Sequence, residues 1–463
     1  MFTITATRKG NKEIMGKIYR YSIGYDIVRG FVKTAHRLFY RKVIVTGREN
    51  IPKDKPVIFA PNHQNALMDP LALVCTLPSQ IVYLARADIF KSAINRPFLR
   101  FLKIIPVYRI RDGVENLGRN EKTFRQTIEI LQHNTPLCLF PEARHTDKRT
   151  LLPLKKAVPR IAFQAEESGG LGKDLVIIPV GIYYSDYLEP QSILQINYGK
   201  PLQVSEFLAS YRGNPQRAQL ELRDALQAKL SPLMIDIRDA EHYELYETIR
   251  RLYRATMLKE ENLSPHPWEN HFRSDQLTIQ KLEIAAKEDD SFLQLLTDKV
   301  QKYEGLKHEQ KIKEDALEKK PLTPAQAFLT GAGFLLASPM IAFGWLHHAL
   351  PHYLLKNHVN NKIEDSQMRS SFYFVLGMLA FSAMYVVELL TLGRLFPGWW
   401  KVHYLIAMPL SGVFTYRLIR SWKVFRNRLR LRFGLSKEKQ KSLLDSRQEV
   451  ISFCQKAFSA QKQ

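Results

Sequence analysis

Two residues that suit general base catalysis lie close together near the start of the chain. Residues 61–70 read PNHQNALMDP and directly follow an apolar run, VIFA at 57–60. An imidazole such as that of His63 can take a proton near neutral pH, and a carboxylate on its other ring nitrogen fixes its tautomer. Asp69 is close enough to be that carboxylate. The alternative is structural, because Asn62 and Asp69 are also common turn and capping residues.

A second polar group follows another apolar run, LCLF at 137–140, where residues 139–148 read LFPEARHTDK. Glu142 and Arg144 stand just past the run, and Pro141 stiffens the turn between them and the strand. A carboxylate and a guanidinium in this place suit contact with a polyol or a phosphate. A solvated loop would have the same composition.

Two arginines form a third group, in IPVYRIRDG at 105–113. Arg109 and Arg111 alternate along an extended segment and therefore point the same way. Two guanidinium groups on one face suit a phosphate, although a surface strand shows the same pattern.

The elements that position these groups alternate between strand and helix patterns from Val43 to about Ser231. The apolar runs are VIFA at 57–60, IVYLA at 81–85, LCLF at 137–140, LVIIPVGIYY at 175–184 and ILQINYG at 193–199. Helices are expected between them, including 120–133 and 214–230. This alternation predicts an α/β layer fold, in which catalytic residues commonly follow the ends of strands.

Taken together and in this order, the groups resemble the motifs of the glycerolipid acyltransferase superfamily over residues 40–230. The matching residues are Asn62, His63 and Asp69; Ile105, Pro106, Val107 and Arg109; Phe140, Pro141, Glu142 and Ala143; Lys155 and Lys156; residues 176–181 around Pro179; and Gly199, Lys200 and Pro201. The resemblance implies the fold of that family, a mixed sheet with flanking helices. It also implies an enzyme that moves acyl chains from coenzyme A or acyl carrier protein to glycerol phosphates.

In the mechanism that the resemblance implies, His63 takes a proton from a glycerol hydroxyl and Asp69 stabilises the imidazolium. The substrate phosphate would be held by Arg109, Lys155, Lys156 and Arg144, and a second hydroxyl by Glu142. No bound cofactor and no metal are required, because the acyl thioester is a co-substrate.

The sequence departs from the family pattern in two places. Five residues separate His63 from Asp69, where the family commonly has four, so the turn between them must differ. The second departure is in the family's third motif, which is matched here by Phe140, Pro141, Glu142 and Ala143. In this motif Ala143 replaces glycine, Arg144 comes one place early, and His145 stands where arginine is usual. Either Arg144 or His145 is therefore expected to take the role of that arginine.

The longer spacing is similar to that of fungal-type glycerol-3-phosphate and dihydroxyacetone-phosphate acyltransferases. We therefore expect acyl transfer to one of these two phosphates, the first step of phosphatidic acid synthesis. The alternatives are acylation of a lysophospholipid (1-acylglycerol 3-phosphate) and, from another class of protein, a non-catalytic membrane scaffold.

Three apolar stretches beyond Pro324 approach the length needed to span a bilayer, at about 328–350, 372–392 and 402–418. Residues 417–441 then hold ten Lys and Arg against one acid, which predicts a cytoplasmic tail. Three spans would separate this tail from the catalytic domain, so one stretch is expected not to cross. Ser338 and Pro339 interrupt the first, which favours a re-entrant or interfacial hairpin there. The alternative for the whole region is a buried helical bundle.

We expect five segments along the chain. They are an amphipathic membrane-interface helix over 1–42, for which core packing is an equal alternative, an acyltransferase domain over 43–235, a helical connector over 236–320, transmembrane or re-entrant helices over 321–420, and a basic tail over 421–463. No cleavable signal peptide is evident, so we expect an integral membrane protein with its catalytic domain on the cytoplasmic face.

The net charge of +23 fits an anionic partner, and the apolar C-terminal third favours anionic membrane lipid. The basic tail carries no recognisable nucleic-acid motif, so we expect no nucleic acid. Cys75, Cys138 and Cys454 lie far apart without metal-ligand spacing, which argues against a zinc site or a disulfide framework.

Overall fold

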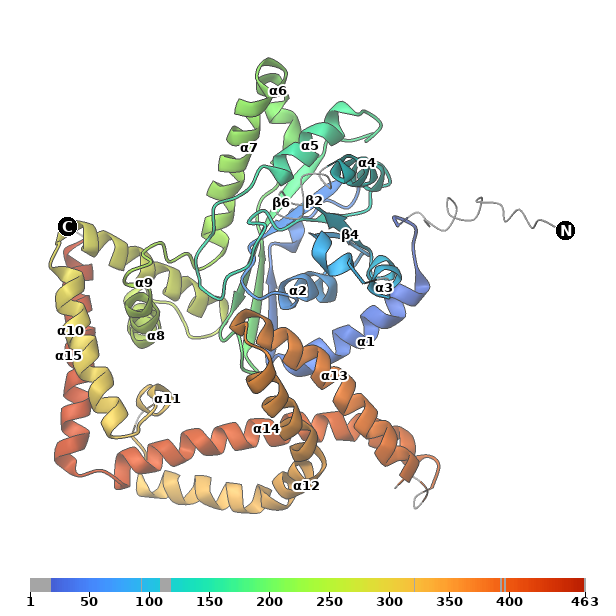
Figure 1. The fold of residues 1–463 in the computed structure, drawn as a ribbon. Helices are drawn as coiled ribbons and strands as arrows, with labels where there is room; N and C mark the ends of the chain where they lie inside the picture. The colour runs from blue at the N-terminus through green and yellow to red at the C-terminus, as the bar shows by residue number, and fades with distance from the viewer. Residues whose placement is uncertain are drawn as a thin grey trace. The chain divides into compact units, whose positions relative to one another are not determined.

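The computed structural model describes residues 18–92, 94–108, 118–319, 321–391, 394 and 397–461. The chain divides into two units (Figure 1). The first unit runs to Met234 and also includes a distant segment, Asp365–Ser371. The second unit is formed by Ile235–Glu364 and Phe372–Gln463.

The first unit is built on an eight-stranded mixed sheet. Its strands are β1 (Lys42–Thr46), β2 (Val57–Pro61), β3 (Val82–Arg86), β4 (Ile104–Val107), β5 (Leu137–Cys138), β6 (Val176–Tyr184), β7 (Ile193–Tyr198) and β8 (Leu202–Gln203). Their order in space is β1-β7-β6-β2-β5-β3-β4, with β8 also beside β6. Strand β6 is antiparallel to β7 and β8, and the other pairs are parallel. All five apolar runs contain a strand, so the predicted mixed α/β sheet is confirmed.

Helices flank this sheet on both faces (Figure 1). They are α1 (Ile23–Phe39), α2 (Met68–Thr76), α3 (Asn95–Phe101), α4 (Arg119–Gln132), α5 (Ala157–Glu167), α6 (Leu208–Gly213) and α7 (Pro215–Leu230). The core on one face joins strand residues such as Ile58 and Ile177 to Ile161 of α5 and Leu222 of α7. Burial of such aliphatic side chains stabilises the layer by roughly 1.5–3 kcal/mol each. The helices expected over 120–133 and 214–230 correspond to α4 and α7.

The second unit is helical. Its helices are α8 (Tyr243–Glu260), α9 (Glu269–Glu288), α10 (Phe292–Glu309), α11 (Glu314–Leu317), α12 (Pro324–Lys362), α13 (Ser366–Thr391, in this unit from Phe372), α14 (Trp400–Phe433) and α15 (Lys437–Ala460). Helix α15 lies within the segment 421–463, which was predicted from the sequence to be a basic tail. It packs on α10, where the rings of Phe292 and Phe453 stack with centroids 5.5 Å apart.

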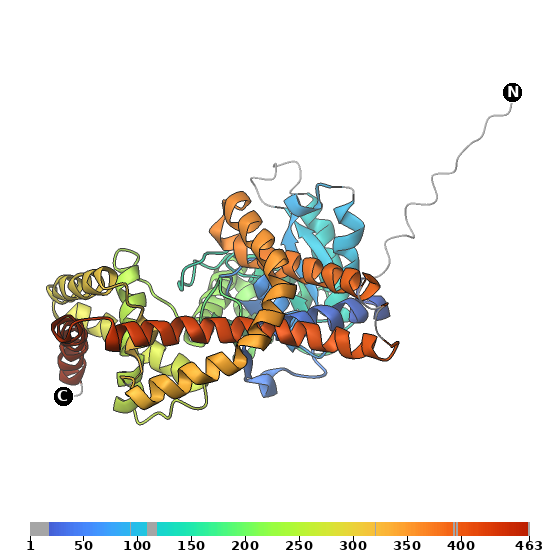
Figure 2. The same cartoon turned by 90° about the horizontal axis from the view of Figure 1, so that it is seen from below.

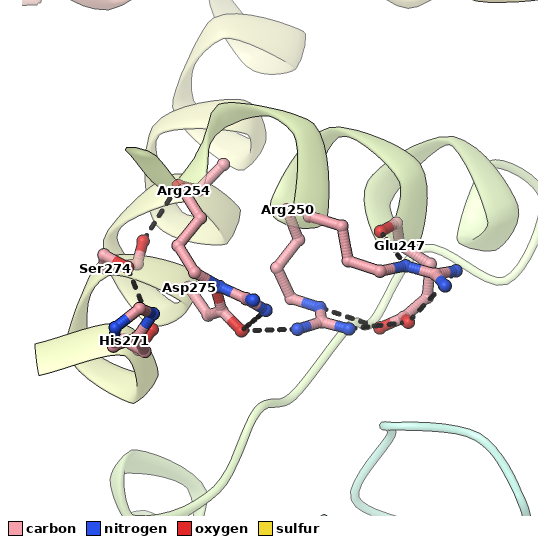
Figure 3. Close-up of polar contacts among 8 residues, drawn as sticks. Glu247, Arg250, Arg254, His271, Ser274 and Asp275 are labelled. Carbon is pink, nitrogen blue, oxygen red and sulfur yellow. Dashed lines mark hydrogen bonds and ion pairs between the residues drawn. The ribbon is translucent and has the colours of Figure 1, made fainter. Parts of the chain in front are cut away.

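A buried ionic cluster joins α8 to α9 (Figure 3). The guanidinium of Arg254 donates to both carboxylate oxygens of Asp275 at 2.7 and 2.9 Å. Arg250 bonds to the same carboxylate and also donates to Glu247 at 3.0 and 2.8 Å. Asp275 is fully buried, and burial acts to raise its pKa. The charges of Arg254 and Arg250 outweigh burial and hold that pKa below its ordinary value of 3.8.

Two helices among the described residues, α12 and α13, are long and apolar enough to cross a membrane. Only 6% and 11% of the residues in their apolar windows are buried, which is unusual for core helices of a water-soluble protein. Helices α12 and α14 lie side by side (Figure 2). The interruption expected at Ser338 and Pro339 is not found, because α12 is helical through both residues, while a re-entrant or interfacial placement of this stretch stays a prediction. Proline removes one backbone hydrogen bond, a loss that a long apolar helix tolerates.

Of the three apolar stretches, the third, in α14, is the one that is not long and apolar enough to cross a membrane among the described residues. The sequence had suggested that the first stretch does not cross. The apolar part of the third stretch, 402–418, continues without a break into the basic residues that end α14 at Phe433. The apolar run in this helix is therefore shorter than in α12 or α13.

Candidate active site

His63 and Asp69 meet at the carboxyl end of β2. The Nδ1 atom of His63 lies 2.8 Å from Oδ2 of Asp69. His63 follows the strand and its side chain is 16% exposed, whereas Asp69 lies in the first turn of α2 and is fully buried. Because Nδ1 faces the carboxylate, Nε2 is the ring nitrogen left to take a proton from a bound hydroxyl. The structure therefore brings together the two side chains that the sequence singled out.

The carboxylate of Asp69 accepts three further hydrogen bonds. The backbone amides of Gln64 and Asn65 donate to Oδ2 at 2.7 and 2.8 Å, and the phenol of Tyr184 donates to Oδ1 at 2.8 Å. Burial and the neighbouring negative charge of Asp69 raise the pKa of Tyr184 well above 10.0, so the phenol keeps its proton. These donors fix the carboxylate that orients His63.

The longer spacing between His63 and Asp69 is accommodated by an unusual turn. Ala66 has a φ of +35°, and the amide of Met68 donates to the carbonyl of Asn65 at 2.8 Å. A non-glycine residue in the left-handed region costs roughly 1–2 kcal/mol. This turn returns the chain so that Asp69 still reaches His63.

Glu142 joins the two loops of the site. Its Oε1 accepts the amide of His63 at 2.7 Å, and its Oε2 accepts the amide of Leu152 at 2.9 Å. The amide of Thr146 in turn donates to the carbonyl of His63 at 3.2 Å. Glu142 is almost fully buried, so in this structure it positions backbone. The contact with a substrate hydroxyl stays a prediction.

Two rings lie against the imidazole of His63. Phe140 stacks on it with centroids 4.1 Å apart, and His145 meets it edge to face at 5.1 Å. Burial and the neighbouring His63 lower the pKa of His145 below its ordinary value of 6.5, so its ring is largely neutral at neutral pH. His145 thus lies beside the imidazole of His63, while Arg144 is exposed on the same loop.

Three other motif residues serve the backbone. The side chain of Asn62 donates to the carbonyl of Ile182 at 3.1 Å and accepts its amide at 2.6 Å, which ties the end of β2 to β6. Pro179 lies opposite Ala60 in the same pair of strands. The carbonyl of Pro141 accepts the amide of Lys155 at 2.8 Å. These contacts align the strand ends that carry the site.

The predicted phosphate ligands lie partly within the described residues. Lys155 and Lys156 are exposed just before α5, and the bond from Lys155 to Pro141 brings this pair beside the third motif. Arg109 lies outside the described residues. The described residues contain no group of three His, Cys, Asp or Glu side chains placed to hold a metal.

Two side chains of this region were not anticipated from the sequence. Tyr184, at the end of β6, contacts Asp69, and the available signal was its place at the carboxyl end of a strand parallel to β2. Arg149 is 3% exposed, with its guanidinium 5.0 Å from the ring centre of Tyr183 and 4.8 Å from that of Tyr187. No local pattern distinguished Arg149 from the other basic residues near it.

Comparison with known proteins identifies the family of this domain. Residues 42–183 match the acyltransferase family model. The chain is 29% identical over 133 residues to glycerol-3-phosphate O-acyltransferase 1 of Saccharomyces cerevisiae, a match that covers 28% of this chain and 17% of the yeast protein. It is 27% identical over 163 residues to 1-acyl-sn-glycerol-3-phosphate acyltransferase of Borreliella burgdorferi, covering 35% of this chain and 59% of that protein.

The crystal structure of a 1-acyl-sn-glycerophosphate acyltransferase from Thermotoga maritima is also similar. It is 22% identical, with a TM-score of 0.32, and the match covers 44% of this chain and 78% of that one. The chain thus matches less than two thirds of the length of either curated relative. Residues 42–183 therefore form an acyltransferase domain that is similar to those of glycerolipid acyltransferases.

Proposed function

We propose that this protein transfers an acyl group from a thioester to the hydroxyl of glycerol 3-phosphate or dihydroxyacetone phosphate. The observation that carries the proposal is the 2.8 Å contact between His63 and a buried, fourfold hydrogen-bonded Asp69. An imidazole held in this way has one nitrogen free for proton transfer and a carboxylate to stabilise its charged form. The reaction would be the first step of phosphatidic acid synthesis.

The chemical step needs no covalent enzyme intermediate. Nε2 of His63 takes the hydroxyl proton as the substrate oxygen attacks the thioester carbonyl. The tetrahedral intermediate collapses by breaking the carbon–sulfur bond, and the departing thiolate receives the proton from the imidazolium. The acyl ester and a free thiol are the products. The donor would be a thioester of coenzyme A or of acyl carrier protein.

Exposed cations near the third motif would bind the phosphate. Lys155 and Lys156 lie beside Pro141, and Arg144 belongs to the same loop as His145. We assign the same role to Arg109. Holding the phosphate aligns the hydroxyl with His63, and alignment of this kind lowers the barrier by several kcal/mol.

Two observations support glycerol 3-phosphate or dihydroxyacetone phosphate as the acceptor. The five-residue interval between His63 and Asp69 resembles that of fungal-type enzymes, and the chain matches the yeast protein. The match to the Borreliella protein favours a second candidate, acylation of 1-acylglycerol 3-phosphate. A non-catalytic scaffold is the candidate from another class, and the altered third motif supports it.

We further propose that the protein is held in a membrane by α12 and α13. Two spans would leave the catalytic domain and the basic segment 417–441 on the same, cytoplasmic side. Helix α1 of the first unit buries Tyr25 and His36 while Ile23, Ile27 and Phe31 are exposed. An amphipathic helix with its apolar face outward suits a membrane interface rich in anionic lipid.

The test is acyl transfer from palmitoyl-CoA by membranes that carry wild type or His63→Ala, with three acceptors: glycerol 3-phosphate, dihydroxyacetone phosphate and lysophosphatidate. Transfer to either small phosphate that falls at least about 100-fold in the variant supports the proposal. Transfer to lysophosphatidate alone would replace the acceptor but retain the chemistry. Equal rates for wild type and variant, with acyl carrier protein donors also inactive, would favour the scaffold.

A further inference from the structure

A short segment far from His63 in the chain belongs to the first unit. Residues Asp365–Ser371 are grouped with the sheet and not with the helices on either side of them. They include the first turn of α13, the apolar helix that continues from Phe372 to Thr391. Ser370 and Ser371 are 1% and 3% exposed, so both hydroxyls are buried.

These hydroxyls bond to the loop between His63 and Asp69. The amide of Leu67 donates to Oγ of Ser371 at 3.0 Å, and Oγ of Ser370 donates to Oδ1 of Asn65. Nearby, Oγ of Ser366 donates to Oδ2 of Asp147 in the loop of the third motif, at 2.9 Å. The segment therefore contacts both loops that form the site.

The two serines hold the residues on either side of a strained position. Ala66, with φ of +35°, stands between Asn65 and Leu67. Conformations of this kind persist only where surrounding contacts determine them. Leu67 also precedes α2, whose start receives no side-chain cap from its own loop. The hydroxyl oxygen of Ser371 is the hydrogen-bond acceptor for the backbone amide of Leu67.

The same loop conformation orients the catalytic carboxylate. The amide of Asn65, whose side chain Ser370 holds, donates to Oδ2 of Asp69 at 2.8 Å. That oxygen is the one that contacts His63. A shift of Asn65 would therefore move or release the acceptor that fixes the imidazole.

We propose that Ser370 and Ser371 are positioning residues that hold the loop 64–68 so that Asp69 is aligned with His63. This inference rests on the proposed acyl transfer. It makes the site depend on the first two turns of a helix that is long and apolar enough to cross a membrane. Displacement of these turns would release the loop and lower the rate without removing any group that touches substrate.

The experiment compares Ser370→Ala, Ser371→Ala and the double variant with wild type, as full-length protein in membranes. Ser338→Ala is the matched control, because Ser338 is exposed and bonds only to Leu335 of its own helix among the contacts described. The double variant should lose roughly 10- to 100-fold in kcat, with KM for the acyl donor changed less than about twofold. Ser371→Thr keeps the hydroxyl and should keep most of the activity.

Amide hydrogen exchange gives a second measurement that does not depend on activity. Exchange in peptides covering 62–69 should become faster in the double variant, while exchange in β6 stays as in wild type. Wild-type exchange and kcat in the double variant would overturn the inference, as would a fall in kcat with unchanged exchange at 62–69. Faster exchange throughout the first unit would assign the serines a general structural role and also overturn it.

Failure of the proposed function would look different. In that case wild type is inactive with every acceptor, and the exchange comparison alone decides whether the two serines hold the loop.

Discussion

The phenol of Tyr184 donates a 2.8 Å hydrogen bond to Oδ1 of Asp69, from the end of a strand more than a hundred residues away in the chain. Both groups are fully buried. A buried carboxylate that loses one donor has no water to replace it. The position of Asp69 therefore depends on β6 as well as on its own loop.

Replacing Tyr184 by Phe should lower kcat about tenfold and reduce the free energy of unfolding by about 1–3 kcal/mol, because Oδ1 of Asp69 is left without this donor. Steady-state kinetics and thermal unfolding measure the two effects. The matched control is Tyr198→Phe, since the Tyr198 hydroxyl contacts Thr76 and not Asp69. Equal losses of activity in both variants would contradict a specific role for Tyr184.

Replacing Ala143 by Gly should stabilise the protein by about 1 kcal/mol. Ala143 has a φ of +59°, in the region that glycine adopts without steric cost, and glycine is the residue that the family has at this place. Chemical unfolding measures the change. Ala225→Gly is the control, because Ala225 lies inside α7, where glycine is expected to destabilise by roughly 1 kcal/mol. If both variants destabilise equally, the left-handed backbone at 143 is not strained.

Replacing Asp275 by Asn should destabilise the second unit by roughly 3–5 kcal/mol. The change removes the charge that faces the buried Arg250 and its neighbour Arg254. Circular dichroism during heating measures the loss. Asp54→Asn is the matched control, since Asp54 forms an exposed pair with Lys173 and should change stability little. Similar losses in the two variants would mean that the buried cluster contributes no more than a surface pair.

The stability of the first unit should fall as the pH is lowered from about 6.5 to about 4. Burial lowers the pKa of His36 from its ordinary value of 6.5 to about 4. Between these values the unfolded chain binds a proton that the folded chain does not, so acid favours unfolding. The contribution of His36 to the free energy of unfolding, roughly 3 kcal/mol, is present in full above pH 6.5 and is lost progressively as the pH falls to about 4.

Urea unfolding between pH 7.5 and 4 tests this dependence on His36. In His36→Leu the part of the slope that comes from this residue should be absent. A variant with the same slope as wild type would show that His36 is protonated equally in the folded and unfolded states.

Much of the sheet could be predicted because its information is local. Apolar runs such as 57–60 and 175–184 alternate with helical patterns, and each run contains a strand. The pair His63 and Asp69 was also accessible, because only six positions separate them and one turn is enough to bring them together. The interruption expected at Ser338 and Pro339 could not be predicted correctly from the local sequence, since Pro339 lies inside α12 and marks no boundary of that helix.

The sequence by itself thus determined the layers of the first unit and the two side chains that meet at the end of β2. Tertiary structure alone decided what holds them: the carboxylate of Glu142 on the amide of His63, the phenol of Tyr184 on Asp69, and Ser370 and Ser371 on the loop 64–68. The physical reason is that a hydrogen bond between groups far apart in the chain depends on how strands and helices pack. The periodicity of apolar residues along the chain does not predict that packing.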